Sequence, residues 1–177
     1  LVVRQADGAL VDLEGKVPAF TEEQAKPEDL AEAFINIDRS RPLIVGIIPH
    51  TQCIPRTPAC GFCTFPHDAQ NKSQRASVVR SVERDISNVV KWHGDKLSRR
   101  RVDAIYFGGG TANLSSTSEI QKLFDALATN FKVAQAEVTL EGIPSLFASW
   151  FHAQLKALAK LPVRHKRISM GIQTFNP

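Results

Sequence analysis

The sequence lacks the features that mark membrane and secreted proteins. No apolar run approaches the roughly 20 residues that a membrane-spanning helix needs. The chain does not open on a charged segment followed by an apolar one, the pattern of a secretory signal peptide. Internal repeats and low-complexity segments are also missing. These absences predict one globular, cytoplasmic protein whose cysteines stay reduced.

Cysteine is scarce and clustered. The 177 residues contain three cysteines, Cys53, Cys60 and Cys63, spaced Cys-x6-Cys-x2-Cys. An odd number cannot pair completely in disulfides, and clustering among Pro and Gly residues argues against simple core positions. Two kinds of metal centre remain as alternatives. One is an iron–sulfur cluster, which normally takes four cysteines. The other is a zinc ion, with His50 and His67 as possible further ligands, and this stretch alone favours neither.

The net charge of +4 comes largely from two basic runs, Lys96 to Arg101 and Arg164 to Arg167. Runs of this kind can contact nucleic acid. Both runs follow predicted helices, however, and cations suit the negative end of a helix dipole. They are therefore interpreted as solvated helix ends, and nucleic acid is not expected as a partner.

Short apolar runs alternate along the chain with stretches of helical periodicity. The pattern predicts strands over Leu43 to Ile48, Ala104 to Phe107, Glu137 to Leu140 and Arg167 to Ile172, and helices over Ser73 to His93, Thr117 to Phe131 and Pro144 to Leu161. Ser116 and Glu119 have the spacing of a capping box. This alternation predicts an α/β fold with parallel strands, either a barrel or an open doubly wound sheet. Residues 1–42 form an extension, with a short strand or hairpin in 1–20 and one helix at Pro27 to Asp38.

Four segments with polar or glycine residues follow the four predicted strands. They are the cysteine loop, Gly108 to Thr111, Glu141 and Gln173. Functional residues of parallel α/β folds lie at the carboxyl ends of the strands, so all four segments should lie along the same edge of the sheet. Each has an ordinary alternative role, as a tight strand exit, a salt bridge or a surface amide. A structural zinc ion does not explain why all four segments should lie at one edge. A cluster that carries an organic ligand does explain it.

The four motifs CGFCTF, YFGGGT, VTLEG and RISMGIQTFN occur in this order after the four strands. The chain thereby resembles the radical S-adenosylmethionine (SAM) superfamily, within it the oxygen-independent coproporphyrinogen III oxidase-like group, from about Leu43 to Pro177. The ordered set is far more specific than any one motif. The resemblance implies a partial (β/α) TIM-like barrel, with about four of its strands in this chain. Residues 43–177 would be the N-terminal part of that core.

The resemblance also implies two cofactors. Cys53, Cys60 and Cys63 would hold three irons of a [4Fe–4S] cluster, and SAM would bind the fourth iron through its amino and carboxylate groups. The motifs also imply contacts to SAM by Phe62 near the adenine, by Gly109, Gly110 and Thr111 at the methionine amino end, and by Glu141 and Gln173 on the ribose and methionine side.

The implied activity is reductive cleavage of SAM to methionine and a 5′-deoxyadenosyl radical, which abstracts a substrate hydrogen. A flavodoxin or ferredoxin would supply the electron, and no residue is assigned as catalytic. The family's first cysteine gap is three residues rather than six, and its strand-one tyrosine is missing from LIVGII. A substrate other than a porphyrinogen is therefore expected. The alternative is a non-catalytic iron–sulfur or zinc module, or a haem-chaperone-like protein.

The family barrel has six strands, and four strands leave an open sheet edge. We therefore expect the remainder of the barrel in a further C-terminal segment or a partner chain. On this expectation, the 177 residues alone cleave SAM poorly.

Overall fold

The computed structural model describes residues 2–4, 10–12, 40–54, 63, 65, 68, 70–94, 97–148 and 153–172. The chain divides into two compact units, Leu1–Asp38 and Arg39–Pro177. In the first unit, β1 (Val2–Arg4) pairs antiparallel with β2 (Leu10–Asp12), the second of the two alternatives, short strand or hairpin, that were predicted within 1–20. The helix predicted at Pro27 to Asp38 lies outside the described residues.

The second unit is built on one parallel sheet. Its strands are β3 (Leu43–Ile47), β4 (Val102–Phe107), β5 (Glu137–Gly142) and β6 (His165–Met170), in the spatial order β3-β4-β5-β6. All three neighbouring pairs are parallel. This confirms the predicted α/β fold with four parallel strands, while closure into a TIM-like barrel stays a prediction.

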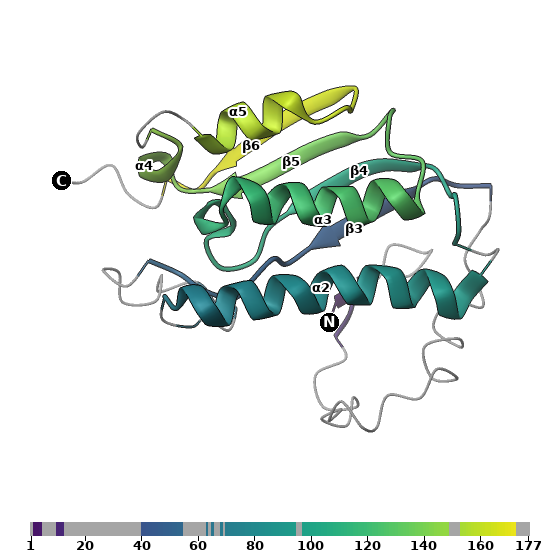
Figure 1. Cartoon of the computed structure of the whole chain (residues 1–177), viewed down its shortest axis with the longest axis horizontal. Helices are drawn as coiled ribbons and strands as arrows, with labels where there is room; N and C mark the ends of the chain where they lie inside the picture. Colours follow the sequence, from purple (N-terminus) through teal and green to yellow (C-terminus); the bar gives the residue numbers. More distant parts are fainter. Residues whose placement is uncertain are drawn as a thin grey trace. The chain divides into compact units, whose positions relative to one another are not determined.

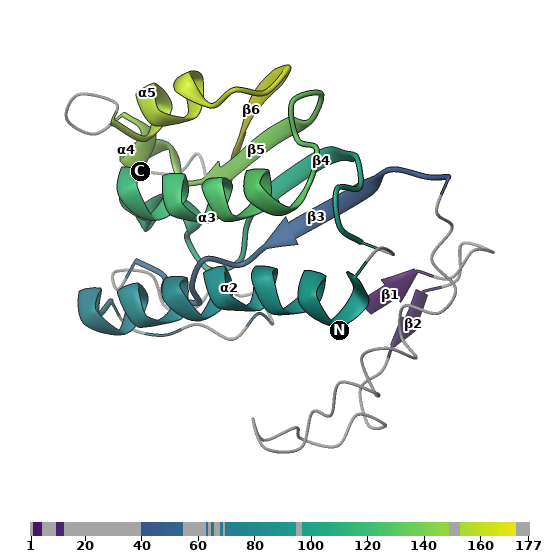
Figure 2. The same cartoon turned by 45° about the vertical axis from the view of Figure 1, so that its right-hand side comes forward.

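Helices connect the strands. They are α2 (Lys72–His93), the short 3-10 helix η2 (Ala112–Leu114), α3 (Thr117–Asn130), α4 (Pro144–Phe147) and α5 (Ala153–Lys160). Figures 1 and 2 show α2, α3 and α5 on the same side of the four-stranded sheet. No described helix is both long enough and apolar enough to cross a membrane.

Local sequence determines where two helices begin. The Asn71 side chain caps α2 by accepting from the Gln74 backbone N–H. The predicted capping box of α3 is confirmed, because Ser116 and Glu119 each accept a hydrogen bond from the other's backbone N–H.

The prediction of one helix from Pro144 to Leu161 is wrong. α4 ends at Phe147, Ala148 is a turn residue, and the next described helix is α5, Ala153–Lys160. Phe147 and Leu158, one on each helix, are both buried. The apolar spacing therefore runs across two helices, and periodicity could not reveal the interruption.

The two faces of the sheet differ. Paired residues in a parallel sheet share a face and alternate along each strand. One face supplies the buried core, which α3 completes with Ile120, Leu123, Phe124 and Leu127. The strand residues of that core are Ile47, Ile105, Phe107, Val138 and Leu140. The opposite face carries Tyr106, Thr139 and Glu141, and also Ile44, which is 80% exposed.

The second basic run does not lie at a helix end. α5 ends at Lys160, and His165 to Arg167 form the first half of β6 with exposed side chains. Arg167 extends across β5, where its Nε lies 3.1 Å from Glu137 Oε1 and donates to Thr139 Oγ1 at 2.9 Å. The helix-end interpretation is therefore wrong for this run.

Candidate functional site

The exits of β3 and β4 are bonded to each other at the carboxyl edge of the sheet. Gly108 N–H donates to Ile47 O at 3.0 Å, and Thr111 N–H donates to Gln52 O at 2.9 Å. Cys53 follows Gln52 directly, and Glu141 is the penultimate residue of β5. The predicted site residues at this edge are thus Cys53, Gly109, Gly110, Thr111 and Glu141, whereas Cys60, Phe62 and Gln173 lie outside the described residues.

The cysteine loop is closed at its neck. Cys53 N–H donates to Asp68 O at 3.2 Å, and Asp68 N–H donates to Thr51 O at 3.1 Å. The Thr51 hydroxyl also donates to Asp68 Oδ2 at 2.5 Å. Cys53 is partly buried, Cys63 is exposed, and neither is part of a disulfide. The long gap between Cys53 and Cys60 therefore lies inside a closed loop, and its length does not set the backbone position of Cys53.

The glycine segment packs against this neck. A Cβ on Gly110 would lie 2.6 Å from Gln52 O and 2.7 Å from Thr51 O, both backbone atoms. Gly109 has φ +97°, in the left-handed region that side-chain-bearing residues rarely adopt. Glycine is therefore required here for contact between the two loops. The predicted contact of Gly109 and Gly110 with a ligand stays a prediction.

Tyr106 lies beside Glu141. A Cβ on Gly108 would meet both, at 2.5 Å from Tyr106 Cε1 and 2.9 Å from Glu141 Oε2. Burial raises the pKa of Tyr106, Ser169 opposes that rise by hydrogen bonding, and Glu141 adds to it. Tyr106 is therefore a neutral phenol next to a carboxylate. Tyr106 was not selected from the sequence. Its position two residues before Gly108 could have indicated it, because residues two apart along a strand lie on the same face of the sheet.

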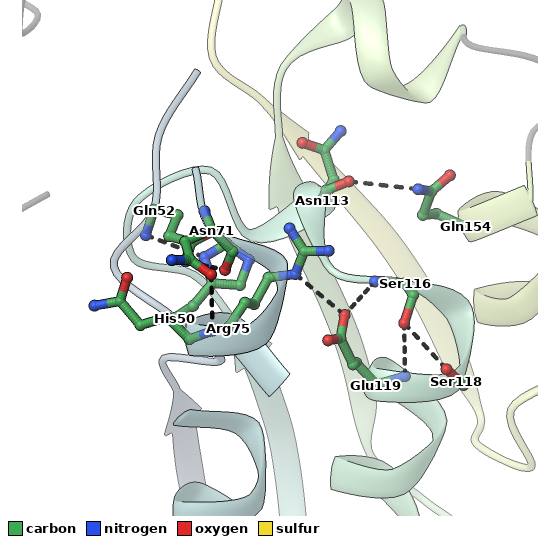
Figure 3. A network of polar contacts seen from close by, with 10 residues as sticks. His50, Gln52, Asn71, Arg75, Asn113, Ser116, Ser118, Glu119 and Gln154 are labelled. Carbon is green, nitrogen blue, oxygen red and sulfur yellow. Dashed lines mark hydrogen bonds and ion pairs between the residues drawn. The ribbon is translucent and has the colours of Figure 1, made fainter. Parts of the chain in front are cut away.

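A buried polar network links the exit of β3 to the start of α2 (Figure 3). His50 is 1% exposed, and its Nδ1 accepts from Gln52 N–H at 3.2 Å. The Gln52 amide donates to Asn71 O at 2.7 Å and accepts from Asn71 N–H at 3.1 Å. Nothing in the sequence indicated this contact, because the two residues are 19 positions apart.

The same network continues to the start of α3. Arg75 Nε lies 3.4 Å from Glu119 Oε2, an ion pair without hydrogen-bond geometry. Burial opposes ionisation of Glu119, but the Ser116 hydrogen bonds and Arg75 outweigh burial and lower its pKa. His50 Nε2 has no hydrogen-bond partner among the described residues.

His50 does not complete a zinc site in the described part of the chain. Its Nδ1 already accepts a hydrogen bond, and its ring is buried beside Arg75. Among the described residues, no three His, Cys, Asp or Glu side chains are grouped to hold a metal ion. A zinc set of His50, Cys53 and Cys63 is therefore not formed, while His67 and Cys60 lie outside the described residues.

We expect His50 to make the fold acid-sensitive. Burial, with help from the Arg75 guanidinium, lowers the pKa of His50 from 6.5 to about 4. The unfolded chain therefore binds this proton more readily than the folded one between those values. The contribution of His50 to the free energy of unfolding is fully present above pH 6.5. It falls by about 3 kcal/mol as the pH drops to 4. Urea unfolding at a series of pH values measures this loss.

His50→Gln is the test variant. His165→Gln is its matched control, because His165 is exposed on β6. His50→Gln should remove most of the loss between pH 6.5 and 4, whereas His165→Gln should retain it. Equal pH profiles for the two variants would contradict the role given to His50.

The comparisons with known proteins gave distant relatives. No protein-family profile and no solved structure matches the chain. Heme chaperone HemW of Buchnera aphidicola subsp. Schizaphis graminum is 26% identical over 126 residues, which cover 66% of this chain and 29% of that protein. Radical S-adenosyl methionine domain-containing protein 1, mitochondrial, of Danio rerio is 27% identical over 126 residues, with 70% and 26% covered. Anaerobilin synthase of Escherichia coli O157:H7 is 28% identical over 123 residues, with 66% and 25% covered.

These relatives are radical SAM proteins of the coproporphyrinogen oxidase-like group, so the resemblance that the four motifs predicted is confirmed. The chain spans less than a third of the length of each.

Proposed function

We propose that the chain carries the cofactor site of a radical SAM protein. Cys53, Cys60 and Cys63 would hold a [4Fe–4S] cluster, and SAM would bind beside it along the same edge. The observation that carries the proposal is the hydrogen bond from Thr111 to Gln52, which joins the glycine segment to the neck of the cysteine loop. The YFGGGT motif is thus bonded to the residue that directly precedes Cys53.

The residues at this edge fit the proposed cofactors. Thiolates are the ligands that iron–sulfur clusters take. Cys53 is partly buried and Cys63 is exposed, so neither is a core residue. The Cys53 backbone is fixed by Asp68, which orients a first ligand. On β5, the Glu141 carboxylate can accept hydrogen bonds from ribose hydroxyls, and Thr111 can donate or accept.

When both are bound, the cluster and SAM would supply reductive cleavage of a carbon–sulfur bond, with one electron from a flavodoxin or ferredoxin, giving methionine and a radical that takes hydrogen from a substrate. The chain's own contribution is positioning. The neutral Tyr106 phenol beside Glu141 can donate a hydrogen bond while the carboxylate accepts one. The substrate and the net reaction are not assigned.

The test is anaerobic reconstitution with iron and sulfide, reduction with dithionite, and assay of 5′-deoxyadenosine after SAM is added. The proposal predicts a cluster and 5′-deoxyadenosine formation at a level above that of the Cys60→Ala variant. A cluster without any 5′-deoxyadenosine would contradict the catalytic part.

A second candidate is a haem chaperone, since two of the relatives are named heme chaperone HemW. On this alternative, the reconstituted chain binds haem and forms no 5′-deoxyadenosine. Haem titration followed by absorbance, run beside the 5′-deoxyadenosine assay, separates the two functions.

Glu141→Ala is expected to weaken SAM binding and leave the cluster in place. A hydrogen bond to a charged group contributes about 1.5–3 kcal/mol, so the dissociation constant should rise roughly tenfold or more. Glu137→Ala is the matched control, because Glu137 lies four residues earlier on β5, on the same face, and pairs with Arg167 instead. Calorimetric titration of the reconstituted proteins measures both constants, and equal weakening by the two substitutions would count against a contact at Glu141.

A further inference from the structure

We propose that two buried side-chain amides position the two halves of the site separately. Gln52 positions the cysteine loop, and Asn113 positions the segment that would bind SAM. This inference rests on the proposed function. Each amide forms what we term a clasp, in which its oxygen and nitrogen bond the N–H and C=O of a single distant residue.

The Gln52 clasp belongs to the neck of the cysteine loop. Gln52 is 2% exposed and bonds both backbone groups of Asn71, the cap of α2. Its own backbone pairs with Asp68 across the neck, and Cys53 follows it directly. Through this clasp, the 22-residue helix α2 fixes the backbone that carries the first cysteine.

The Asn113 clasp belongs to the other half. Asn113 lies in η2, two residues after Thr111, and is 0% exposed. Its Oδ1 accepts from Ile143 N–H at 3.2 Å, and its Nδ2 donates to Ile143 O at 3.1 Å. A Cβ on Gly142 would lie 2.0 Å from Asn113 Cγ, so the amide rests directly on that glycine. The clasp therefore joins the glycine segment to the residue that follows β5, two positions after Glu141.

The two clasps have no bonding partner in common. Gln52 bonds Asn71, and Asn113 bonds Ile143. Figure 3 shows a further contact, from Gln154 Nε2 to Asn113 O at 3.5 Å. The backbone bond from Thr111 to Gln52 joins the two segments but involves neither amide side chain, so we expect substitutions at the two amides to have different main effects. Loss of the first clasp should therefore change the cluster, and loss of the second should change the response to SAM.

The experiment compares Gln52→Glu with Asn113→Asp in the reconstituted full chain. Each substitution keeps the side-chain shape and places an oxygen against a backbone carbonyl that had accepted a hydrogen bond. Three quantities are measured: the rate of iron loss to a chelator, the EPR spectrum of the reduced cluster without SAM, and the dissociation constant of SAM. A structural role alone would not move the EPR spectrum or that constant selectively.

We expect Gln52→Glu to speed iron loss about tenfold and to alter the EPR spectrum, with little change in the dissociation constant. Asn113→Asp should weaken SAM binding about tenfold and leave the EPR spectrum without SAM unchanged. If either variant fails to fold, Gln52→Met and Asn113→Leu keep the side-chain volume without either hydrogen bond.

Equal effects of the two substitutions on all three quantities would overturn the separate roles. A wild-type chain that takes up neither iron nor sulfide would instead overturn the proposed function, and this inference with it. Iron and sulfide analysis of the wild-type protein therefore distinguishes the two failures.

Discussion

Cys60→Ala is expected to abolish the cluster. The 177 residues contain three cysteines, so no other thiol can replace the lost ligand. We expect about four irons and four sulfides per reconstituted wild-type chain, with the broad absorbance of a [4Fe–4S] centre, and close to none in the variant. Iron and sulfide analysis with absorbance spectroscopy measures the difference.

His67→Ala is the control that separates cluster from zinc. His67 is the histidine nearest in sequence to Cys63, and a zinc site would depend on it. The cluster needs only the three cysteines, so His67→Ala should retain the iron and the sulfide. About one zinc and no sulfide in the wild-type chain, lost on His67→Ala, would contradict the account.

Gly110→Ala is expected to destabilise the protein and impair cluster loading. The new Cβ would lie under 3 Å from three backbone atoms of Thr51 and Gln52, which cannot move aside as the end of a side chain can. Overpacking of this kind costs about 1–3 kcal/mol. In a protein of this size, that lowers the melting temperature by roughly 2–12 °C. The displaced neck should also reduce the iron bound per chain.

Gly46→Ala is its matched control. Gly46 lies in β3 on the same face as Tyr106, opposite the described helices, and a Cβ there would meet nothing within 4 Å. The same substitution should therefore shift the melting temperature little. Thermal unfolding followed by circular dichroism compares the two, and equal shifts would refute the packing argument.

Much of the fold was predictable because its signals are local. The apolar run at Leu43 to Ile48 and the helical period from Ser73 to His93 each match an observed element within one residue at either end. The Ser116 and Glu119 pair predicted where α3 begins. The strand–helix alternation then predicted a parallel sheet, and with it the edge where the neck of the cysteine loop meets the glycine segment.

The parts that could not be predicted depend on contacts between distant residues. In the sequence, Gln52 and Asn71 look like ordinary polar residues, and only the folded chain brings the exit of β3 to the start of α2. Asn113 packs directly against Gly142, so the need for glycine at position 142 becomes clear only when Asn113 is seen beside it. β6 begins at His165, two residues before the predicted strand, because pairing with β5 draws a basic segment into the sheet.

The most direct test of the central claim is the EPR spectrum of the reduced, reconstituted chain before and after saturation with SAM. If three cysteines hold a [4Fe–4S] cluster and SAM binds the remaining iron, the spectrum changes when SAM is added. A spectrum that is identical with and without saturating SAM would contradict the account.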